Sequence, residues 1–202
     1  MSLIIKNKIA QLKKGYPTVS DKYNVQGGIY VGESKDALHF GDLVFTSGTT
    51  GHYVTFEDAE EDAKLAGICL ATNVKLANRY PGDSNAKVET LKGEAFNLLV
   101  RGFVAVAIAD ATTAYTTAKA AYELVIKDKT KTAEEKKQAK ATFETAKAKA
   151  IASAAVEGAP VYLVDGELKT TGADDQELKD VYFMGVAEII DDEVLAEINY
   201  KM

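Results

Sequence analysis

The chain contains few of the residues that usually build chemical sites. Its 202 residues include one cysteine, two histidines, three prolines and no tryptophan. A single cysteine excludes an internal disulfide and is typical of synthesis in a reducing compartment. Because no basic and apolar segment opens the sequence, we expect no signal peptide. The longest apolar run, residues 98–109, contains Arg101 and falls short of the about 18 residues that a bilayer-spanning helix needs. We therefore expect a soluble protein with no membrane partner.

Positive charge is scarce outside one segment. The whole chain has a formal net charge of −6, but residues 1–23 carry five lysines against one aspartate, a net charge of +4. The remaining residues therefore carry −10. This acidic majority argues against non-specific binding to nucleic acid. A basic segment attached to an acidic body is typical of a segment that docks on another surface.

Residues 1–26 form the predicted N-terminal arm. In the segment LIIKNKIAQLKKGYP, the residues Ile5, Ile9 and Leu12 share one face of a helix, which Gly15 and Pro17 would end. Two interpretations are open: a helix packed on its own body, or an arm that docks on another surface. The candidate contact residues of this arm are Lys6, Lys8, Ile9, Leu12, Lys13, Lys14, Tyr16 and Pro17.

Residues 27–109 and 158–202 are typical of a β body. Short apolar runs with glycine between them, such as GGIYVG at 27–32, predict strands. From residue 100 to 108, one face of the predicted strand holds Arg101 and Phe103, and the other holds Val100, Gly102, Val104, Val106 and Ile108. This period of two predicts a strand with at least one buried face. Asp165-Gly166 and Asp191-Asp192 predict two hairpin turns. We expect a mainly β fold, a small barrel or sandwich.

The period changes between these two blocks. Alanines recur every three or four residues from 110 to 127 and again from 133 to 156, which predicts an antiparallel α-helical hairpin inserted at residues 110–157. Thr132 and Glu135 form a capping box at the start of the second helix, and Gly158 is placed to end it. The helices would be about 27 and 36 Å long at 1.5 Å per residue.

The hairpin carries three aromatic residues that could pack its helices. Tyr115, Tyr122 and Phe143 lie on or beside its alanine stripes and are the candidate packing residues. Residues 110–157 hold nine lysines and seven acidic residues, so the hairpin is nearly neutral. Because alanine buries little area, we expect it to pack laterally, on its own barrel or on the hairpins of other copies. A solvated spacer in a surface loop is the alternative.

The segment FTSGTTG at 45–51 is similar to the phosphate-binding loop of adenylate-forming enzymes. That loop normally continues into Pro-Lys-Gly, whereas here Gly51 is followed by His-Tyr-Val. The segment also does not open a helix whose N-terminus could face a phosphate. A turn between two strands explains the same residues, and we expect a turn.

No other motif predicts chemistry. His39, His52 and Cys69 lack the spacing of metal ligands or of a nucleophile and its base. The acidic run at 57–62 lacks the alternating ligands and central glycine of a calcium loop. The segment GDSNAK at 82–87 is an incomplete phosphate loop. We therefore expect no enzyme activity, no catalytic residue, no metal and no cofactor.

The order of five segments resembles the structural cement proteins of bacteriophage heads. GYPTVSDKYNVQGG is similar to the end of their N-terminal segment, LHFGDLVFTSG to their first core strand, and GEAFNLLVRGFVAVAI to their central strand pair. GAPVYLVDGELKTTG is similar to a later hairpin and MGVAEIIDDEVLAEINYK to the closing strand pair. The resemblance covers residues 15–109 and 158–200, and residues 110–157 depart from it.

The resemblance implies a non-enzymatic protein that decorates the outside of a phage capsid. Its partner would be the major capsid protein, its expected state a homotrimer, and its location the outer capsid surface after synthesis in the bacterial host cytoplasm. A head fibre or adhesin module that binds a host surface ligand is the alternative. A small enzyme or nucleotide binder built on residues 45–55 is the other.

The turn interpretation predicts that the chain does not bind ATP. Gly48→Ala and Thr50→Ala should change stability at most, because the loop lacks the lysine that phosphate binding needs. Thermal unfolding with and without ATP and magnesium checks this, and a saturable rise in Tm with nucleotide would overturn it.

Overall fold

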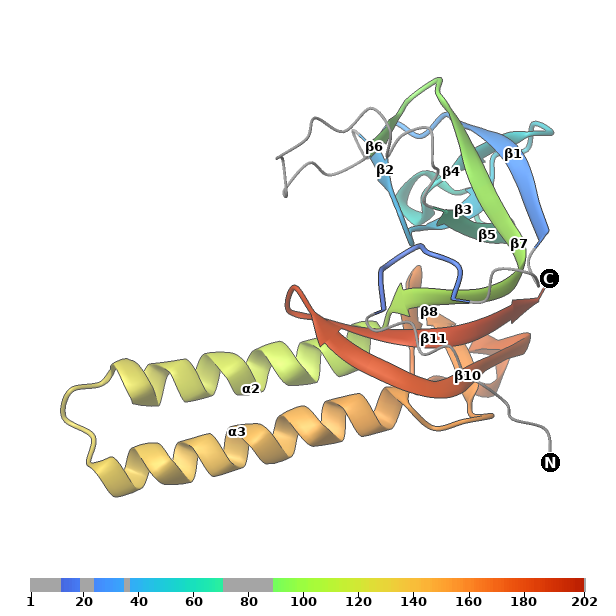
Figure 1. The fold of residues 1–202 in the computed structure, drawn as a ribbon. Helices are drawn as coiled ribbons and strands as arrows, with labels where there is room; N and C mark the ends of the chain where they lie inside the picture. The colour runs from blue at the N-terminus through green and yellow to red at the C-terminus, as the bar shows by residue number, and fades with distance from the viewer. Residues whose placement is uncertain (1–11, 19–23, 35–36, 71–88, 202) are drawn as a thin grey trace, which may run out of the picture.

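A computed structural model of the chain describes residues 12–18, 24–34, 37–70 and 89–201. The fold is mainly β, with a closed five-stranded barrel, further strands and two helices, which confirms the predicted class (Figure 1). The strands are β1 (Asn24–Tyr30), β2 (Ala37–His39), β3 (Leu43–Thr46), β4 (His52–Val54), β5 (Leu65–Leu70), β6 (Glu89–Leu91), β7 (Ala95–Ala107), β8 (Pro160–Val164), β9 (Glu167–Lys169), β10 (Glu177–Ile190) and β11 (Glu193–Lys201). The helices are α2 (Ala109–Lys127) and α3 (Ala133–Ala154), with 3₁₀ turns at Phe56–Asp58 and Asp174–Gln176.

The barrel is formed by β1, β4, β3, β5 and β7 in that order, and β1 pairs again with β7 to close it. Buried and exposed residues alternate at the end of β1 and the start of β7, whereas β5 is buried at five of its six positions. Apolar side chains such as Tyr30, Val44 and Leu98 are fully or almost fully buried. β2 and β6 pair with each other beside the barrel. The turn at 47–51 joins β3 to β4, with Gly48 and Gly51 both at positive φ. A turn is therefore what the structure has at FTSGTTG.

β7 belongs to both the barrel and a second sheet. Residues 95–101 pair with β1, and residues 101–107 pair with β11. Between the two halves lies Gly102 at a φ of +142°, a conformation open to glycine. The strand pair that the resemblance implies here is therefore wrong: the segment is one continuous strand. The chain does not reverse at Arg101-Gly102 because partners on both sides hold it extended.

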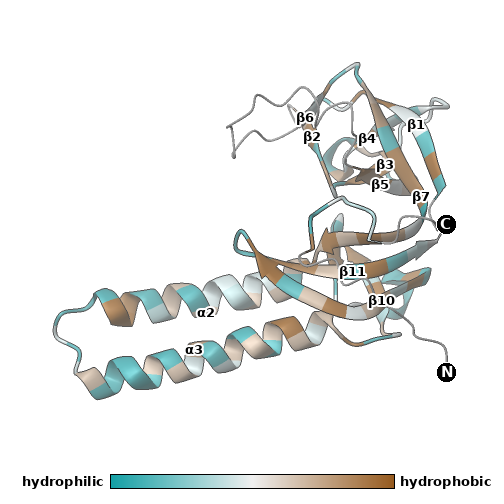
Figure 2. Ribbon diagram, viewed as in Figure 1, coloured by the Kyte–Doolittle hydropathy of each residue, from teal (hydrophilic) through white to brown (hydrophobic). Residues whose placement is uncertain are grey.

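The second sheet continues from β7 through β11, β10 and β8 to β9. Asp191 and Asp192, at φ of 50° and 67°, turn β10 into β11, and Asp165 and Gly166, at 53° and 77°, turn β8 into β9. Both predicted hairpins are thus confirmed, with the left-handed backbone that two-residue hairpin turns require. One apolar cluster runs from the barrel through β7 into this sheet and includes Ile68, Val104 and Phe183. The barrel is one lobe of the molecule, and the second sheet is the other. Figure 2 shows the apolar residues of both lobes gathered on the strands.

Residues 12–18 run beside the second half of β7. The N–H of Gly15 donates to the carbonyl of Ala105 (2.9 Å) and that of Thr18 to the carbonyl of Phe103 (3.0 Å). Pro17 forms a β-bridge with Val104. The predicted helix is therefore wrong at Leu12, since the segment pairs with a strand instead of coiling. Ile5 and Ile9, on which the helix also depended, lie outside the described residues.

The two helices are antiparallel and leave and re-enter the same sheet. Thr132 and Glu135 form the predicted capping box at the start of α3. Gly158 does not end the helix, because α3 ends at Ala154 with Ala155 as its C-cap. Gly158 instead has a φ of 77° and donates its N–H to the carbonyl of Phe183 (2.9 Å), which starts the path into β8.

Gly67 in β5 is the position of the barrel where the packing is most exacting. A Cβ atom there would lie 2.3 Å from the carbonyl oxygen of Leu99, so the backbones of β5 and β7 would have to separate. Gly67→Ala should therefore lower the free energy of unfolding by about 1–3 kcal/mol. Gly27→Ala in β1 is the matched control, because nothing lies within 4 Å of its added Cβ. Urea unfolding of both variants checks this, and equal midpoints would contradict it.

Candidate interaction surface

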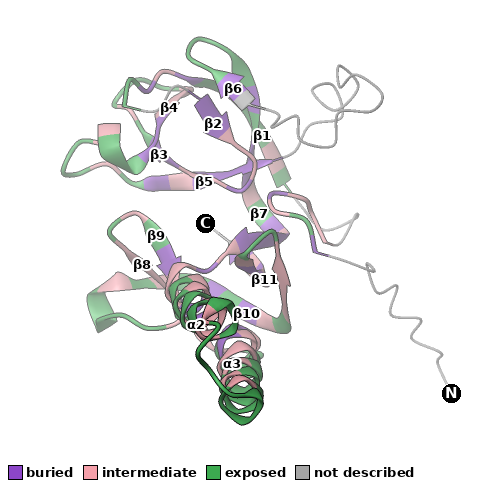
Figure 3. Ribbon diagram, turned by 90° about the vertical axis from the view of Figure 1, so that its left-hand side faces the viewer, coloured by how far each residue is buried: buried purple, intermediate pink, exposed green. Residues whose placement is uncertain are grey.

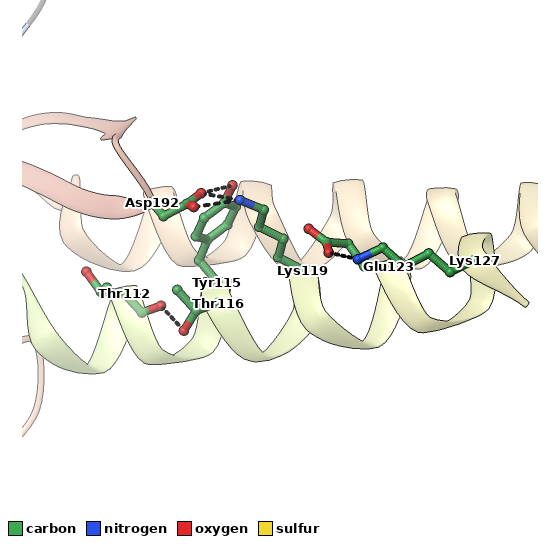
Figure 4. Close-up of polar contacts among 7 residues, drawn as sticks. All are labelled: Thr112, Tyr115, Thr116, Lys119, Glu123, Lys127 and Asp192. Atoms are coloured by element: carbon green, nitrogen blue, oxygen red, sulfur yellow. Dashed lines mark hydrogen bonds and ion pairs between the residues drawn. The ribbon is translucent and has the colours of Figure 1, made fainter. Parts of the chain in front are cut away.

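The root of the helical hairpin is held by a polar cluster at the turn between β10 and β11. The ammonium of Lys119 donates to both carboxylate oxygens of Asp192 (2.5 and 2.6 Å), and the hydroxyl of Tyr115 donates to the same group (3.4 Å; Figure 4). The hydrogen bond with Asp192 raises the pKa of Lys119, and the bond from Lys119 lowers the pKa of Asp192. Burial raises the pKa of the Tyr115 hydroxyl. This cluster fixes the direction in which α2 leaves the sheet.

The first turn of α2 is attached to two strands as well. The carboxylate of Asp110 accepts hydrogen bonds from the backbone N–H of Thr170 (3.0 Å) and from its hydroxyl (2.6 Å), just after β9. The hydroxyl of Thr112 accepts from the backbone N–H of Val194 in β11 (2.9 Å). The start of α2 is therefore anchored by Asp110 and Thr112. The helical period predicts the helix but not these contacts.

An aromatic stack joins α2 to α3 above this root. The rings of Tyr122 and Phe143 are stacked, with centroids 5.1 Å apart and planes 7° apart. The ring of Tyr115 lies 6.0 Å from that of Phe143. The structure thus brings together the three residues that the sequence suggested for hairpin packing, on the seam between the helices.

The distal part of the hairpin extends away from both lobes (Figure 1). The buried residues of the helices are Ala111, Tyr115, Ala150 and Ala154, all in the half next to the sheet. Figure 3 shows exposed and intermediate residues over the rest of the hairpin. The expectation that it packs along its own barrel is therefore wrong, because its anchors lie on the sheet and direct it outward. Packing on other copies stays a prediction.

The distal hairpin also carries apolar surface. Leu124 is 73% exposed and Ile126 is 39% exposed, near the end of α2. A groove of about 410 Å³ runs between the helices, lined by Ala118, Ala121 and Phe143 among others. Such surface is typical of a site that another protein covers.

The described part of the predicted N-terminal arm is engaged by its own body. Leu12 is 4% exposed, packs with Leu195, and donates its N–H to the carboxylate of Glu188 (3.2 Å). Lys14 forms an ion pair with Glu193 (3.3 Å). The ring of Tyr16 lies edge-on to Phe40 and 5.7 Å from the ammonium of Lys13. Lys6, Lys8 and Ile9 lie outside the described residues.

An acidic cavity that sequence analysis missed lies between the two lobes. It has a volume of about 380 Å³ and is lined by Asp42, Glu57, Asp165, Glu167 and Glu193, with Lys14 at its edge. These carboxylates come from segments far apart in the sequence, so no motif could have revealed the cavity. Within the described ranges, no group of three or more His, Cys, Asp or Glu side chains is placed to hold a metal ion.

The other residues considered as chemical candidates pack or form polar contacts within the fold. Cys69 is fully buried in the barrel, and the imidazole of His39 lies 3.6 Å from the carboxylate of Asp42. Asp58, in the acidic run, accepts hydrogen bonds from the backbone N–H groups of Glu33 and Ser34. Burial alone would raise the pKa of Asp58, but the bonds from Ser34 outweigh it and lower that pKa. The segment at 82–87 lies outside the described residues.

Comparison with known proteins adds no family. No protein-family model matches the chain, and no curated protein sequence matches it. Over the part of the chain that the structure describes, no helix has the length and hydropathy needed to cross a bilayer.

The capping box predicts an acid-sensitive hairpin. The backbone N–H of Thr132, the Lys131 ammonium and the Thr132 hydroxyl lower the pKa of Glu135 from 4.5 to about 2. Because the folded value is below the unfolded one, this stabilisation of α3 should be complete above about pH 4.5 and be lost as the pH falls towards 2. An NMR titration of the Glu135 carboxyl, followed with far-UV circular dichroism, checks it.

Lys131→Met is the informative variant for this titration. It removes the ion pair but leaves the capping box, so the Glu135 pKa should rise towards 4.5 and helix loss should begin at a higher pH. Titration of Glu135 at its ordinary value in the unsubstituted protein would contradict the prediction.

Proposed function

We propose that this chain is a non-enzymatic virion structural protein that decorates and stabilises the outside of a bacteriophage capsid. It would clamp neighbouring copies of the major capsid protein, act as a homotrimer and sit on the outer capsid surface after synthesis in the host cytoplasm. The order of its five strand and turn segments, which resembles that of phage cement proteins, supports this proposal. A barrel and an antiparallel sheet that share one core would form a stable body, and many copies of it could bind a symmetric surface.

The observation that carries the proposal is the hairpin. Its root belongs to the core through Tyr115 and Ala154, while its distal half extends away with an apolar groove and exposed Leu124. A rigid arm of this kind is suited to bridging between subunits. Many symmetric copies would multiply weak contacts of this size through effective concentration.

Only the first residues of the predicted N-terminal arm are proposed to contact a partner. Leu12, Lys14, Tyr16 and Pro17 contact the chain's own strands and side chains. Residues 1–11, with Lys6, Lys8 and Ile9, are the part proposed to contact the capsid or a neighbouring subunit.

A head fibre or adhesin module is the second candidate. The outward direction of the hairpin favours it, together with the exposure of Leu124 and Ile126 near the hairpin tip. In this function the tip would bind a ligand on the host surface, and the barrel and sheet would serve as its mount.

Sedimentation with phage particles tests the proposal. Particles of the phage that encodes the chain are prepared without it and mixed with the purified protein. We expect saturable binding and a higher temperature of capsid disruption, because a clamp adds contacts between capsid subunits. No binding at any concentration would overturn the proposal.

A shortened hairpin separates the two candidates. Replacing residues 120–146 by a short Gly-Ser loop keeps Tyr115, Lys119 and Ala150 at the root, so the body should stay folded. The cement function predicts weaker coating of particles. If this variant coats particles fully while phage adsorption to host cells falls, the adhesin function is correct instead.

A further inference from the structure

The charge of the chain is divided along the axis of the hairpin. Residues 127–140, the tip of the hairpin, hold six lysines and three acidic residues, a net charge of +3. Residues 158–202, which form β8 to β11, hold three lysines and eleven acidic residues, a net charge of −8. The near neutrality of residues 110–157 as a whole therefore conceals a strongly polarised molecule.

The basic end is the tip of the hairpin. Lys129, Lys137 and Lys140 are exposed there, and none of them takes part in an ion pair among the described residues. Lys127 and Lys131, by contrast, are paired within their own helices or connector. The apolar groove between α2 and α3 lies in the same part of the hairpin, where Lys131 is its one lining lysine among the described residues.

The acidic end is the start of β10. Its exposed carboxylates are those of Asp174, Asp175, Glu177 and Asp180. The other end of β10 is at Ile190, next to the Asp192 that holds the hairpin root. The acidic end and the Asp192 turn therefore lie at opposite ends of β10, a strand of 14 residues with register shifts between Glu177 and Tyr182 and between Phe183 and Ala187.

The same stretch of β10 presents apolar side chains. Tyr182 is 38% exposed and Val186 is 41% exposed, whereas Val181 and Phe183 point into the core. Apolar and acidic groups thus occur together on β10, as apolar and basic groups do on the distal hairpin.

We propose that the distal hairpin of one copy docks on the start of β10 in a second copy of this chain. The groove between α2 and α3 receives Tyr182 and Val186, while the net positive charge of the hairpin tip attracts the carboxylates at 174–180. Two hairpin tips repel each other, and so do two acidic ends. Only the head-to-tail arrangement is attractive, so charge sets the direction of assembly.

A head-to-tail contact uses different surfaces on the two copies, and it closes into a ring when the rotation allows. Three such contacts would form the homotrimer, which is the one element of the proposed function on which this inference rests. The contact is tested on purified protein without particles, so its failure and that of capsid binding are distinguishable.

Sedimentation velocity of the full chain provides the first test. We expect association that strengthens with protein concentration at about 50 mM NaCl and weakens about tenfold or more at about 500 mM NaCl, because salt screens exposed charges. A monomer at both salt concentrations overturns the inference, even if the chain coats particles normally. Binding of the monomeric chain to vesicles of phosphatidylserine would identify a lipid surface as the occupant and also overturn it.

A charge exchange provides the second test. Lys137→Glu with Lys140→Glu changes the net charge of residues 127–140 from +3 to −1, so that both ends are acidic. Asp174→Lys with Asp175→Lys changes that of residues 174–180 from −3 to +1, so that both ends are basic. Each double variant alone should stay monomeric, and an equal mixture should associate, since opposite ends again meet. Misfolding would not be repaired by mixing. A mixture that remains monomeric overturns the inference.

A matched pair of substitutions tests the groove. Ala120 and Ala121 are both exposed, but only Ala121 lines the groove. Ala121→Glu should abolish association, and Ala120→Glu, with the same charge change and helix propensity, should retain it. Equal behaviour of the two variants contradicts docking in the groove.

Discussion

The fold depends on β7 having hydrogen-bonded partners on both edges in each of its halves. Its first half lies between β1 and β5 in the barrel, and its second half lies between residues 15–18 and β11. Because a buried backbone must pair its polar groups, each half of β7 requires partners from distant parts of the chain. This one strand joins the barrel to the sheet and gives them a common apolar core.

The hairpin inherits its direction from that arrangement. α2 begins two residues after β7 ends, and Asp110, Thr112 and Lys119 attach it to β9 and β11. The core contacts stop at Tyr115 and Ala150, so the distal helices are stabilised mainly by each other through the Phe143 stack. The distal hairpin therefore keeps an exposed apolar surface, and its tip is charged oppositely to the second sheet. These two properties are the basis of the proposed partners.

Most of the secondary structure could be predicted from residues that lie close together in the sequence. Turn residues that tolerate positive φ marked both hairpins, and the alanine period marked the helices and the position of Tyr115, Tyr122 and Phe143 on their seam. The capping box was visible because its two partners are three residues apart. The contact of Lys119 with Asp192 was not, since 73 residues separate them and nothing local distinguishes either residue.

The sequence by itself thus determined the two helices of the hairpin, the turns and most of the strands, because those choices depend on neighbours within a few residues. Only the tertiary structure decided that β7 continues through Arg101-Gly102 and that residues 12–18 pair with it instead of forming a helix. It also decided that the hairpin points outward and that five carboxylates line one cavity. These outcomes depend on which distant strands become partners, and periodicity holds no information about partners.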